Sequence, residues 1–291
     1  MRSCAKQRSN SEWVGDDITG QHARFDDKVL LLSGASRGVG EQVARQAKTR
    51  GARGLVLVGR DAKTGDGLAK ELTGGVTTAI FVKADLSLPD EPKRIVDIVD
   101  NEFGVVHGLL NSAAETSRGG VWNTTPEMFD TMMAVNVRAP FMLIQHCAKL
   151  MKREGVAGSV VNIGSVTGWG GDVALTHYAI SKGALHTLTR NCAFSLMRDR
   201  IRVNLLNPGW MDTPTEDQTQ RTWHGATDGW LEAAERQQPL GRLIKPDELA
   251  RTICFLLSDE SGLMTGAIID FDQSVVGAGS PSKPREGEVW P

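Results

Sequence analysis

The single tyrosine of the chain, Tyr178, stands four residues before Lys182. Residues at i and i+4 of an α-helix share one face, so a phenol and an ammonium would meet there. An unperturbed phenol, with a pKa of about 10, is a poor base at neutral pH, but a nearby cation can lower that pKa by roughly 1–3 units. We therefore predict that Tyr178 exchanges a proton and that Lys182 lowers its pKa. The alternative is an ordinary pair on a helix surface.

Ser165 follows an aliphatic run, 157–163, that is typical of a buried strand. Its position predicts that the hydroxyl lies at the carboxyl edge of a parallel sheet, where ligands of such folds bind. The alternative is a turn-forming role, since Gly164 and Gly168 flank it.

Asn136 lies in a predicted helix, 127–153, four residues before Pro140. Because proline has no N–H, it cannot donate to the carbonyl of Asn136. That carbonyl could hold a water between Lys182 and solvent, as a proton relay requires. The alternative is a simple kink in the helix.

A glycine-rich turn joins the first predicted strand, 28–33, to a helix at 38–50. Small residues there let the backbone approach a pyrophosphate, whose charge the helix N-terminus stabilises. A tight turn without a ligand is the alternative, but a second strand at 54–59 completes the dinucleotide-binding pattern. The predicted cofactor-binding residues of this turn are Ser33, Gly34, Ser36, Arg37, Gly38, Val39 and Gly40.

The second predicted strand ends at Gly59-Arg60, where units that prefer NAD carry an acid for the ribose 2′-hydroxyl. Gly59 leaves room for a 2′-phosphate, and Arg37 and Arg60 could clamp it through charge-assisted bonds. NADP(H) is therefore favoured, with NAD(H) as the other candidate. Alternatively both arginines are solvated, and Asp61 neutralises Arg60.

Asp85 and Leu86 follow the third predicted strand, 77–83. This position suits contact with the adenine edge of a dinucleotide. Asp85 could equally cap the helix that is entered through Ser87.

Aliphatic runs alternate with helical periodicity along the chain, which predicts an α/β fold. We expect a doubly wound Rossmann fold, a seven-stranded parallel sheet with helices on both faces. Residues 27–272 would form one domain, with a substrate lid at 212–238, a flexible arm at 1–26 and a tail at 273–291. The remaining predicted strands are 106–110, 157–163, 201–206 and 267–271, and the remaining helices are 64–73, 90–103, 127–153, 178–199 and 246–258.

The formal charge of the chain is only -2, which argues against nucleic acid and anionic membranes as partners. Its four cysteines have no metal-ligand spacing, so we expect no metal site and a reducing compartment. The first 25 residues hold no apolar stretch that could serve as a signal peptide. These features predict a cytoplasmic protein.

Taken together, the ordered motifs resemble those of the short-chain dehydrogenase/reductase family over residues 27–272. The resemblance implies that Tyr178 is the acid/base, that Lys182 lowers its pKa and binds the nicotinamide ribose, and that Ser165 orients the substrate oxygen. Asn136 would support the proton relay. The matching motifs are Ser33-Gly34-Ala-Ser-Arg-Gly38-Val-Gly40, Asn111-Ser112-Ala113-Ala114, Asn136, Ser165, Tyr178 with Lys182, and Asn207-Pro208-Gly209 with Thr213.

The resemblance extends the predicted cofactor site to residues after the fourth and sixth strands. Ser112 and Ala114 depart from the family, which usually has a second asparagine and a glycine there, and Ala114 adds a methyl near the cofactor. The family also implies a homo-oligomer, expected to be a tetramer. The added cofactor-binding residues are Asn111, Ala113, Pro208, Gly209, Met211 and Thr213.

The predicted function is hydride transfer between NADP(H) or NAD(H) and a secondary alcohol or ketone, with sugars, polyols and cyclic ketones as candidates. The predicted substrate pocket consists of Ser165, Trp169, Tyr178 and Trp210, whose aromatic rings could stack on a substrate or only pack the lid. Two other functions stay open. One is a catalytically silent dinucleotide-binding redox sensor, and the other is an isomerase on the same scaffold.

Overall fold

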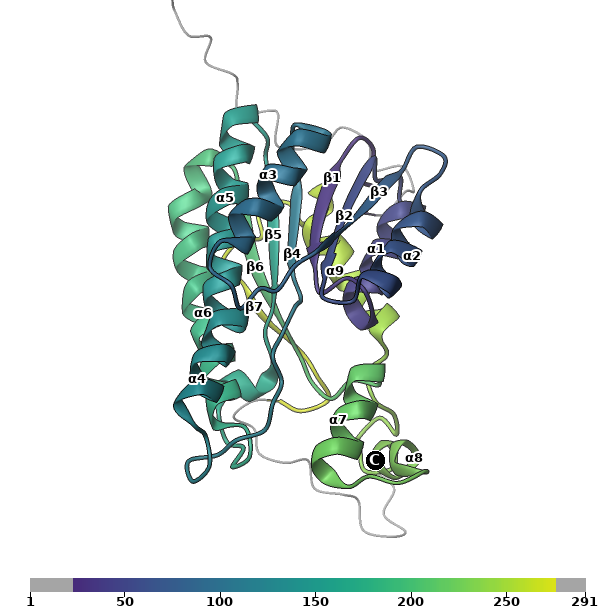
Figure 1. Ribbon diagram of the computed structural model, residues 1–291, viewed down its shortest axis with the longest axis vertical. Helices are drawn as coiled ribbons and strands as arrows, with labels where there is room; N and C mark the ends of the chain where they lie inside the picture. The colour runs from purple at the N-terminus through teal and green to yellow at the C-terminus, as the bar shows by residue number, and fades with distance from the viewer. Residues whose placement is uncertain (1–22, 276–291) are drawn as a thin grey trace, which may run out of the picture.

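The computed structural model describes residues 23–275 (Figure 1). The predicted arm therefore lies outside the described residues over 1–22, and the predicted tail over 276–291. Residues 23–26, which were assigned to the arm, instead pack against the domain, because Ala23 and Phe25 are buried in its core. The packed chain thus includes a short segment that was predicted to be loose.

Seven parallel strands form one sheet in the order β3-β2-β1-β4-β5-β6-β7. The strand order reverses beside β1, which pairs with β2 on one side and β4 on the other, and ligands of doubly wound folds bind at such a switch point. The predicted Rossmann fold is confirmed. The strands are β1 Val29–Ser33, β2 Gly54–Gly59, β3 Thr78–Lys83, β4 Gly108–Asn111, β5 Ser159–Ile163, β6 Arg202–Pro208 and β7 Ile268–Phe271.

Helices cover both faces of the sheet and bury two apolar clusters, one on each side (Figure 1). The strands supply almost continuous aliphatic side chains to both clusters, as expected for a sheet that is covered twice. One face carries α3 (Glu91–Phe103), α5 (Ala139–Glu154) and α6 (Thr176–Leu196), and the other carries α1 (Gly38–Thr49), α2 (Ala62–Leu72) and α9 (Pro246–Leu257).

The predicted helix 127–153 is not one regular helix. It consists of α4 (Pro126–Met133), a π-helical turn over Ala134–Arg138, and α5. Within the turn the N–H of Ala139 donates to the carbonyl of Ala134, five residues back. Pro140 explains the irregularity, because it cannot continue the α-helical hydrogen bonds.

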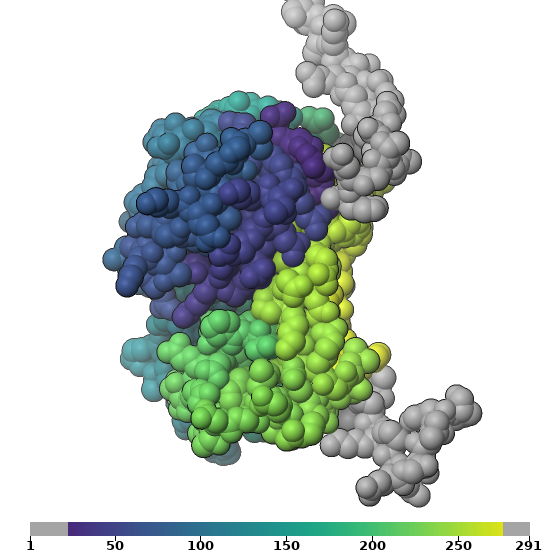
Figure 2. Space-filling view, turned by 90° about the vertical axis from the view of Figure 1, so that its right-hand side faces the viewer, coloured from purple at the N-terminus to yellow at the C-terminus, as the bar shows by residue number. Residues whose placement is uncertain are grey.

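The predicted lid, 212–238, contains two helices that the sequence analysis did not anticipate, α7 (Pro214–His224) and α8 (Trp230–Glu235). Thr213 caps α7, with its side chain accepting a hydrogen bond from the N–H of Glu216, and the helix ends at the left-handed Gly225. Both helices lie beyond the carboxyl ends of the strands (Figure 1). Figure 2 shows them as a lobe that is contiguous with α9.

Over residues 23–275, no helix combines the length and apolar character that crossing a bilayer requires.

Candidate active site

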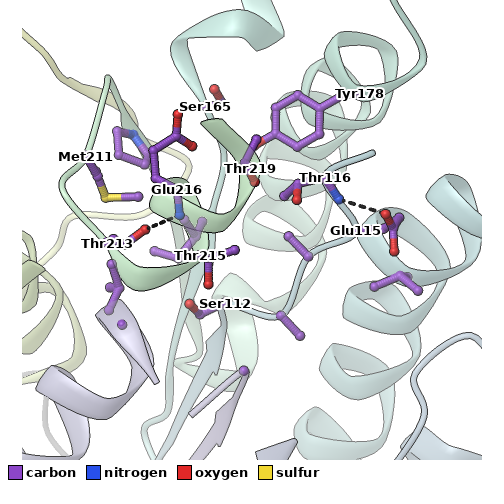
Figure 3. Close-up of a pocket in the computed structure, with 18 of the residues that line it drawn as sticks. Ser112, Glu115, Thr116, Ser165, Tyr178, Met211, Thr213, Thr215, Glu216 and Thr219 are labelled. Atoms are coloured by element: carbon purple, nitrogen blue, oxygen red, sulfur yellow. Dashed lines mark hydrogen bonds between the residues drawn. The ribbon is translucent and has the colours of Figure 1, made fainter. Parts of the chain in front are cut away.

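A cavity of about 390 Å³ opens at the carboxyl edge of the sheet, between the strand ends and α7 (Figure 3). It brings together most of the residues predicted from the sequence. The predicted residues that line it are Gly34, Ser36, Arg37, Gly38, Val39, Arg60, Asp85, Leu86, Ala113, Ser165, Tyr178, Lys182, Pro208, Gly209, Trp210, Met211 and Thr213.

The glycine-rich turn forms a closely packed cradle at the N-terminus of α1. A Cβ on Gly34, whose φ is +68°, would lie 2.6 Å from the backbone nitrogen of Ala113, and a Cβ on Gly40 would lie 2.4 Å from the carbonyl of Gly34. The α1 helix begins at Gly38 with no side chain capping its first amides. These amides lie at the N-terminus of α1 beside the cavity, and the N-terminus of a helix stabilises a bound anion. The residues present therefore fit the diphosphate of a dinucleotide.

Two predicted residues support this cradle from behind without lining the cavity. Ser33 donates from its hydroxyl to the carbonyl of Leu110 at 3.2 Å and accepts from the N–H of Ser112 at 3.2 Å. The side-chain amide of Asn111 donates to Asn162 at 2.8 Å. Both contacts join neighbouring strands, so these residues hold the walls of the site in register.

The exposed Arg37 and Arg60 also line the cavity, together with Gly59. Asp61 does not form an ion pair with Arg60 within residues 23–275. Instead its carboxylate caps α2, accepting from the N–H of Thr64 at 3.3 Å and from its hydroxyl at 2.7 Å. Neither arginine forms an ion pair within the described residues, although the charge of Arg37 contributes to a lowered pKa of Asp61 and the charge of Arg60 to that of Asp85.

Asp85 lines the cavity, and its contact with adenine stays a prediction. The alternative role as a helix cap is wrong, because α3 begins at Glu91 with Asp90 at the N-cap position. The Asp85 carboxylate instead accepts from the N–H of Ser87 at 2.9 Å, which fixes the turn after β3. This hydrogen bond is the main reason that the pKa of Asp85 lies below its ordinary value.

Tyr178 and Lys182 share one face of α6, with the Lys182 Nζ 5.6 Å from the centroid of the phenol ring. The expected lowering of the phenol pKa is absent from the chain itself, because burial raises the pKa of Tyr178 to about 12. The hydrogen bond with Ser165 and the charge of Arg118 act in the opposite direction, and the charge of Glu216 raises the pKa further.

Lys182 does not offset the burial of the phenol, because its ammonium is engaged elsewhere. Its Nζ donates to the main-chain oxygen of Ile163 at 2.8 Å. The side chain is only 3% exposed, and burial lowers the pKa of Lys182 to about 8. The cation thus lies against β5 beside the phenol ring, where it lines the cavity.

Ser165 is held in place by neighbours on two elements. Its N–H donates to the Asn207 Oδ1 at 2.9 Å, and its hydroxyl accepts from the Thr167 hydroxyl at 2.7 Å. A Cβ on Gly164 would lie 2.0 Å from the same Asn207 oxygen, so glycine is needed for this approach. Asn207 in turn donates to Asp270 at 2.9 Å and contacts His186 Nε2 at 3.1 Å.

Asn136 lies behind the site, fully buried, and does not line the cavity. Its side chain holds the loop after β4, accepting from the N–H of Glu115 at 2.7 Å and donating to the carbonyl of the same residue at 3.0 Å. The amide also donates to Ser181 at 3.0 Å. The side chain is therefore used structurally, and a relay through the Asn136 carbonyl stays a prediction.

The position of Trp169 does not support its assignment to the substrate pocket. Its indole N–H donates to Asp270 at 3.0 Å, and its ring packs against His186 with centroids 4.5 Å apart. The short 3-10 turn Val166–Trp169 carries the ring away from the cavity, which Trp169 does not line. Only Trp210 of the two predicted tryptophans reaches the cavity.

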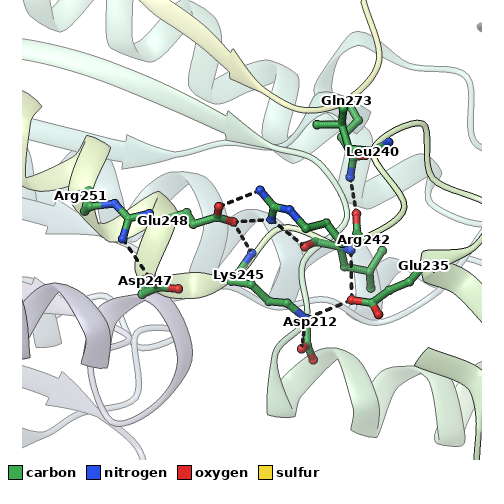
Figure 4. A network of polar contacts seen from close by, with 10 residues as sticks. Asp212, Glu235, Leu240, Arg242, Lys245, Asp247, Glu248, Arg251 and Gln273 are labelled. Atoms are coloured by element: carbon green, nitrogen blue, oxygen red, sulfur yellow. Dashed lines mark hydrogen bonds and ion pairs between the residues drawn. The ribbon is translucent and has the colours of Figure 1, made fainter. Parts of the chain in front are cut away.

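Contacts at two places hold the lid segment, 212–238, in position. Trp210 donates to the Glu216 carboxylate at 2.8 Å and stacks on Trp230 with ring centroids 6.4 Å apart. At the base, the Lys245 Nζ bridges Asp212 at 2.9 Å and Glu235 at 3.0 Å (Figure 4). Lys245 directly precedes α9, so its two ion pairs join both ends of the lid segment to the start of that helix.

Sequence reasoning missed several residues that line the cavity near Tyr178. The clearest are Arg118, in the loop after β4, and Glu216, on α7. In Figure 3 the side chains of Tyr178 and Glu216 approach the same space from α6 and α7. Their positions in the sequence could have indicated them, because both lie in segments that follow strands of the sheet, and such segments meet at its carboxyl edge.

Comparison with known proteins gives a consistent result over most of the chain. The family model described as "Enoyl-(Acyl carrier protein) reductase" matches residues 34–274. An L-rhamnose 1-dehydrogenase (NAD(P)(+)) from Azotobacter vinelandii is 32% identical over 84% of this chain and 95% of its own length. An NADP-dependent (R)-specific alcohol dehydrogenase from Lentilactobacillus kefiri is 30% identical over 84% of this chain and 94% of its own.

A solved structure shows the same architecture. It is a short-chain type dehydrogenase/reductase from Mycobacterium marinum, with a TM-score of 0.78 and 27% identity. The match covers 86% of this chain and 96% of the solved one. The similarity therefore extends over most of the chain and includes the Rossmann-like architecture.

Proposed function

The chain belongs to the short-chain dehydrogenase/reductase family of NAD(P)-dependent oxidoreductases, and we propose that it transfers a hydride between NADP(H) and a secondary alcohol or ketone. The observation that carries this proposal is the single cavity in which the glycine cradle adjoins Ser165, Tyr178 and Lys182. When bound, the nicotinamide supplies the redox chemistry by giving or accepting the hydride.

The residues of the chain would supply positioning and the proton. Tyr178 is protonated at neutral pH, because its pKa is raised to about 12, and is therefore ready to donate to a ketone oxygen. The Ser165 hydroxyl, fixed by Asn207 and Thr167, orients that oxygen. Lys182 places a cation beside the phenol and toward the ribose that the cradle would hold. Together they would hold the substrate carbon at the nicotinamide end of the cavity.

A screen of ketones and secondary alcohols with NADPH, NADH and their oxidised forms tests this function, read at the nicotinamide absorbance. We expect turnover of a subset of these compounds, and the screen includes sugars, polyols and cyclic ketones as candidates. Substrate conversion without a net change in nicotinamide would instead support the isomerase. Nucleotide binding with no turnover of any compound would support the silent redox sensor.

We propose NADP(H) as the preferred cofactor because Gly59 offers no acid and Asp61 is engaged in capping α2. Changing both Arg37 and Arg60 to alanine is expected to lower kcat/KM for NADPH by roughly 10- to 150-fold, while NADH use changes little, because charge-assisted bonds to a phosphate are lost. Lys63→Ala, a cation on α2 that does not line the cavity, is the control. An equal loss with both nucleotides in the double variant would contradict the preference.

We propose a homotetramer in which α5 and α6 pair between subunits. Both helices present large apolar side chains to solvent, including Phe141 at 45%, Ile180 at 47% and Phe194 at 81% exposure. Burial of such a surface favours association. Sedimentation velocity at micromolar concentration is expected to give the mass of a tetramer, and a monomer there would contradict the proposal.

We further propose that residues 27–272 act as one catalytic domain whose segment 212–238 covers the substrate. We also place the enzyme in the cytoplasm, where thiols such as Cys147 and Cys254 stay reduced. Both are buried and unpaired within the described chain, and burial raises the pKa of each thiol to about 12.

A further inference from the structure

Arg118 is a cation in the cavity that the proposed function does not use. It is half-buried, and it lines the cavity from the loop after β4, together with Tyr178 and Glu216. Its Nη1 donates to the carbonyl of Thr116 at 2.9 Å, and its Nε donates to the His224 Nε2 at 3.3 Å. Its other N–H groups have no partner among residues 23–275. The guanidinium is thus oriented by the chain but retains unused donors.

The loop that carries Arg118 is anchored directly before Tyr178. Gly119 pairs with the start of α6, donating to the carbonyl of Ala174 at 2.9 Å and accepting from the N–H of Thr176 at 3.0 Å. His177 is 1% exposed, and its Nδ1 lies 3.1 Å from the carbonyl of Gly119. These contacts fix the position of Arg118 relative to the phenol. The two groups are close enough that the charge of Arg118 acts on the pKa of Tyr178.

Each of the two carboxylates at this end of the cavity accepts hydrogen bonds from other donors through its Oε1. Glu115 accepts from two backbone N–H groups of its own loop, at 3.1 and 3.0 Å. Glu216 accepts from the indole of Trp210 at 2.8 Å and from the amide of Gln220 at 2.7 Å. Within the described part of the chain, no ion pair joins Arg118 to either one. Arg118 is therefore an oriented cation that no carboxylate of the described residues pairs with.

We propose that Arg118 binds a carboxylate of the substrate, so that the enzyme acts on oxo acids and the corresponding hydroxy acids. The planar guanidinium can bind a carboxylate through two parallel charge-assisted bonds. The ketone oxygen would then lie at Tyr178 and Ser165, which line the same cavity. In reduction, the hydride forms the new C–H bond and the Tyr178 proton forms the O–H bond, while the carboxylate is unchanged. This inference rests on the proposed function and names its substrate class.

The test compares pyruvate, acetoacetate and levulinate, each beside its methyl ester, in the wild type and in Arg118→Met. These pairs share the ketone and differ in the charge, and the series varies the distance between them. We expect the wild type to prefer at least one acid over its ester. In Arg118→Met the acid-to-ester ratio of kcat/KM should fall by roughly 10- to 150-fold, the value of a hydrogen-bonded charge. Arg118→Lys should recover part of the ratio, because it keeps the charge without the planar fork.

Arg251→Met is the matched control. It removes a cation from α9 that pairs with Asp247 and does not line the cavity, so the ratio should not change. A wild type that reduces ketones without preferring any acid, or a ratio unchanged in Arg118→Met, would overturn this inference and leave the proposed function standing. If neither acids, esters nor the wider ketone screen support nicotinamide turnover, the proposed function itself fails.

Discussion

Changing Tyr178 to phenylalanine is expected to lower kcat/KM for ketone reduction by roughly 10²- to 10⁴-fold, the usual contribution of a positioned proton donor. Phenylalanine keeps the ring that packs beside Lys182 and loses only the hydroxyl. The expected loss should therefore appear without a change in NADPH binding, measured by nucleotide fluorescence, or in the melting temperature. Full turnover in the variant would show that another group supplies the proton.

The pH dependence of the wild type should report the same phenol. Since burial raises the pKa of Tyr178 to about 12, the proton donor is present throughout the neutral range. Reduction should therefore depend little on the ionisation of Tyr178 near pH 7. Alcohol oxidation needs the phenolate and should rise with pH up to at least pH 10, and Tyr178→Phe should remove this rise.

Changing Lys182 to methionine is expected to lower turnover by about 10²-fold or more while making the folded chain more stable. The variant removes the cation from beside the phenol, so proton exchange and ribose binding both suffer. Yet the native ammonium is 3% exposed, and its burial is unfavourable enough to lower its pKa to about 8. Methionine fills a similar volume without a charge. We expect a gain of roughly 1–3 kcal/mol at pH 7, reduced by the lost bond to Ile163.

The sign of this effect can be checked in the unmutated chain. Between pH 8 and the ordinary lysine pKa of 10.5, the unfolded chain keeps the Lys182 proton that the folded chain has released. Because the unfolded state then binds more protons at Lys182, the contribution of Lys182 to the free energy of unfolding should rise with pH through this window. The buried thiols of Cys147 and Cys254, whose pKa values are raised to about 12, act in the opposite direction above pH 9, and they do so equally in both proteins. The change in the free energy of unfolding between pH 7 and pH 10, measured by urea denaturation, should therefore be more positive in the wild type than in Lys182→Met. Equal pH dependence in both would contradict the assignment.

The sequence predicted the parts of the fold and site that depend on local patterns. The seven strands, the glycine cradle and the i, i+4 relation of Tyr178 and Lys182 all follow from residue spacing, and the structure has each of them. Spacing could not reveal the pKa of Tyr178, because burial of the phenol depends on residues that come from other elements.

Long-range contacts account for the other differences. Trp169 was assigned to the substrate pocket only because it follows β5. Its indole N–H instead donates to Asp270, which lies 101 residues away in the sequence. Arg118 was missed because its proposed role depends on the absence of an ion pair with a carboxylate. Whether an ion pair forms depends on contacts between distant segments, which the sequence does not show. The π-helical turn around Asn136 was predicted only in part, since Pro140 indicated an irregularity in the helix but not its hydrogen-bond pattern.

The central claim is that a hydride passes between the nicotinamide and a substrate carbon while Tyr178 passes the proton. The most direct measurement uses NADPH deuterated at both C4 positions, with a ketone from the screen and mass spectrometry of the product. The account predicts one deuterium on the new carbinol carbon for each NADPH oxidised, and a much slower incorporation in Tyr178→Phe. A product that carries only hydrogen from water at that carbon would contradict it.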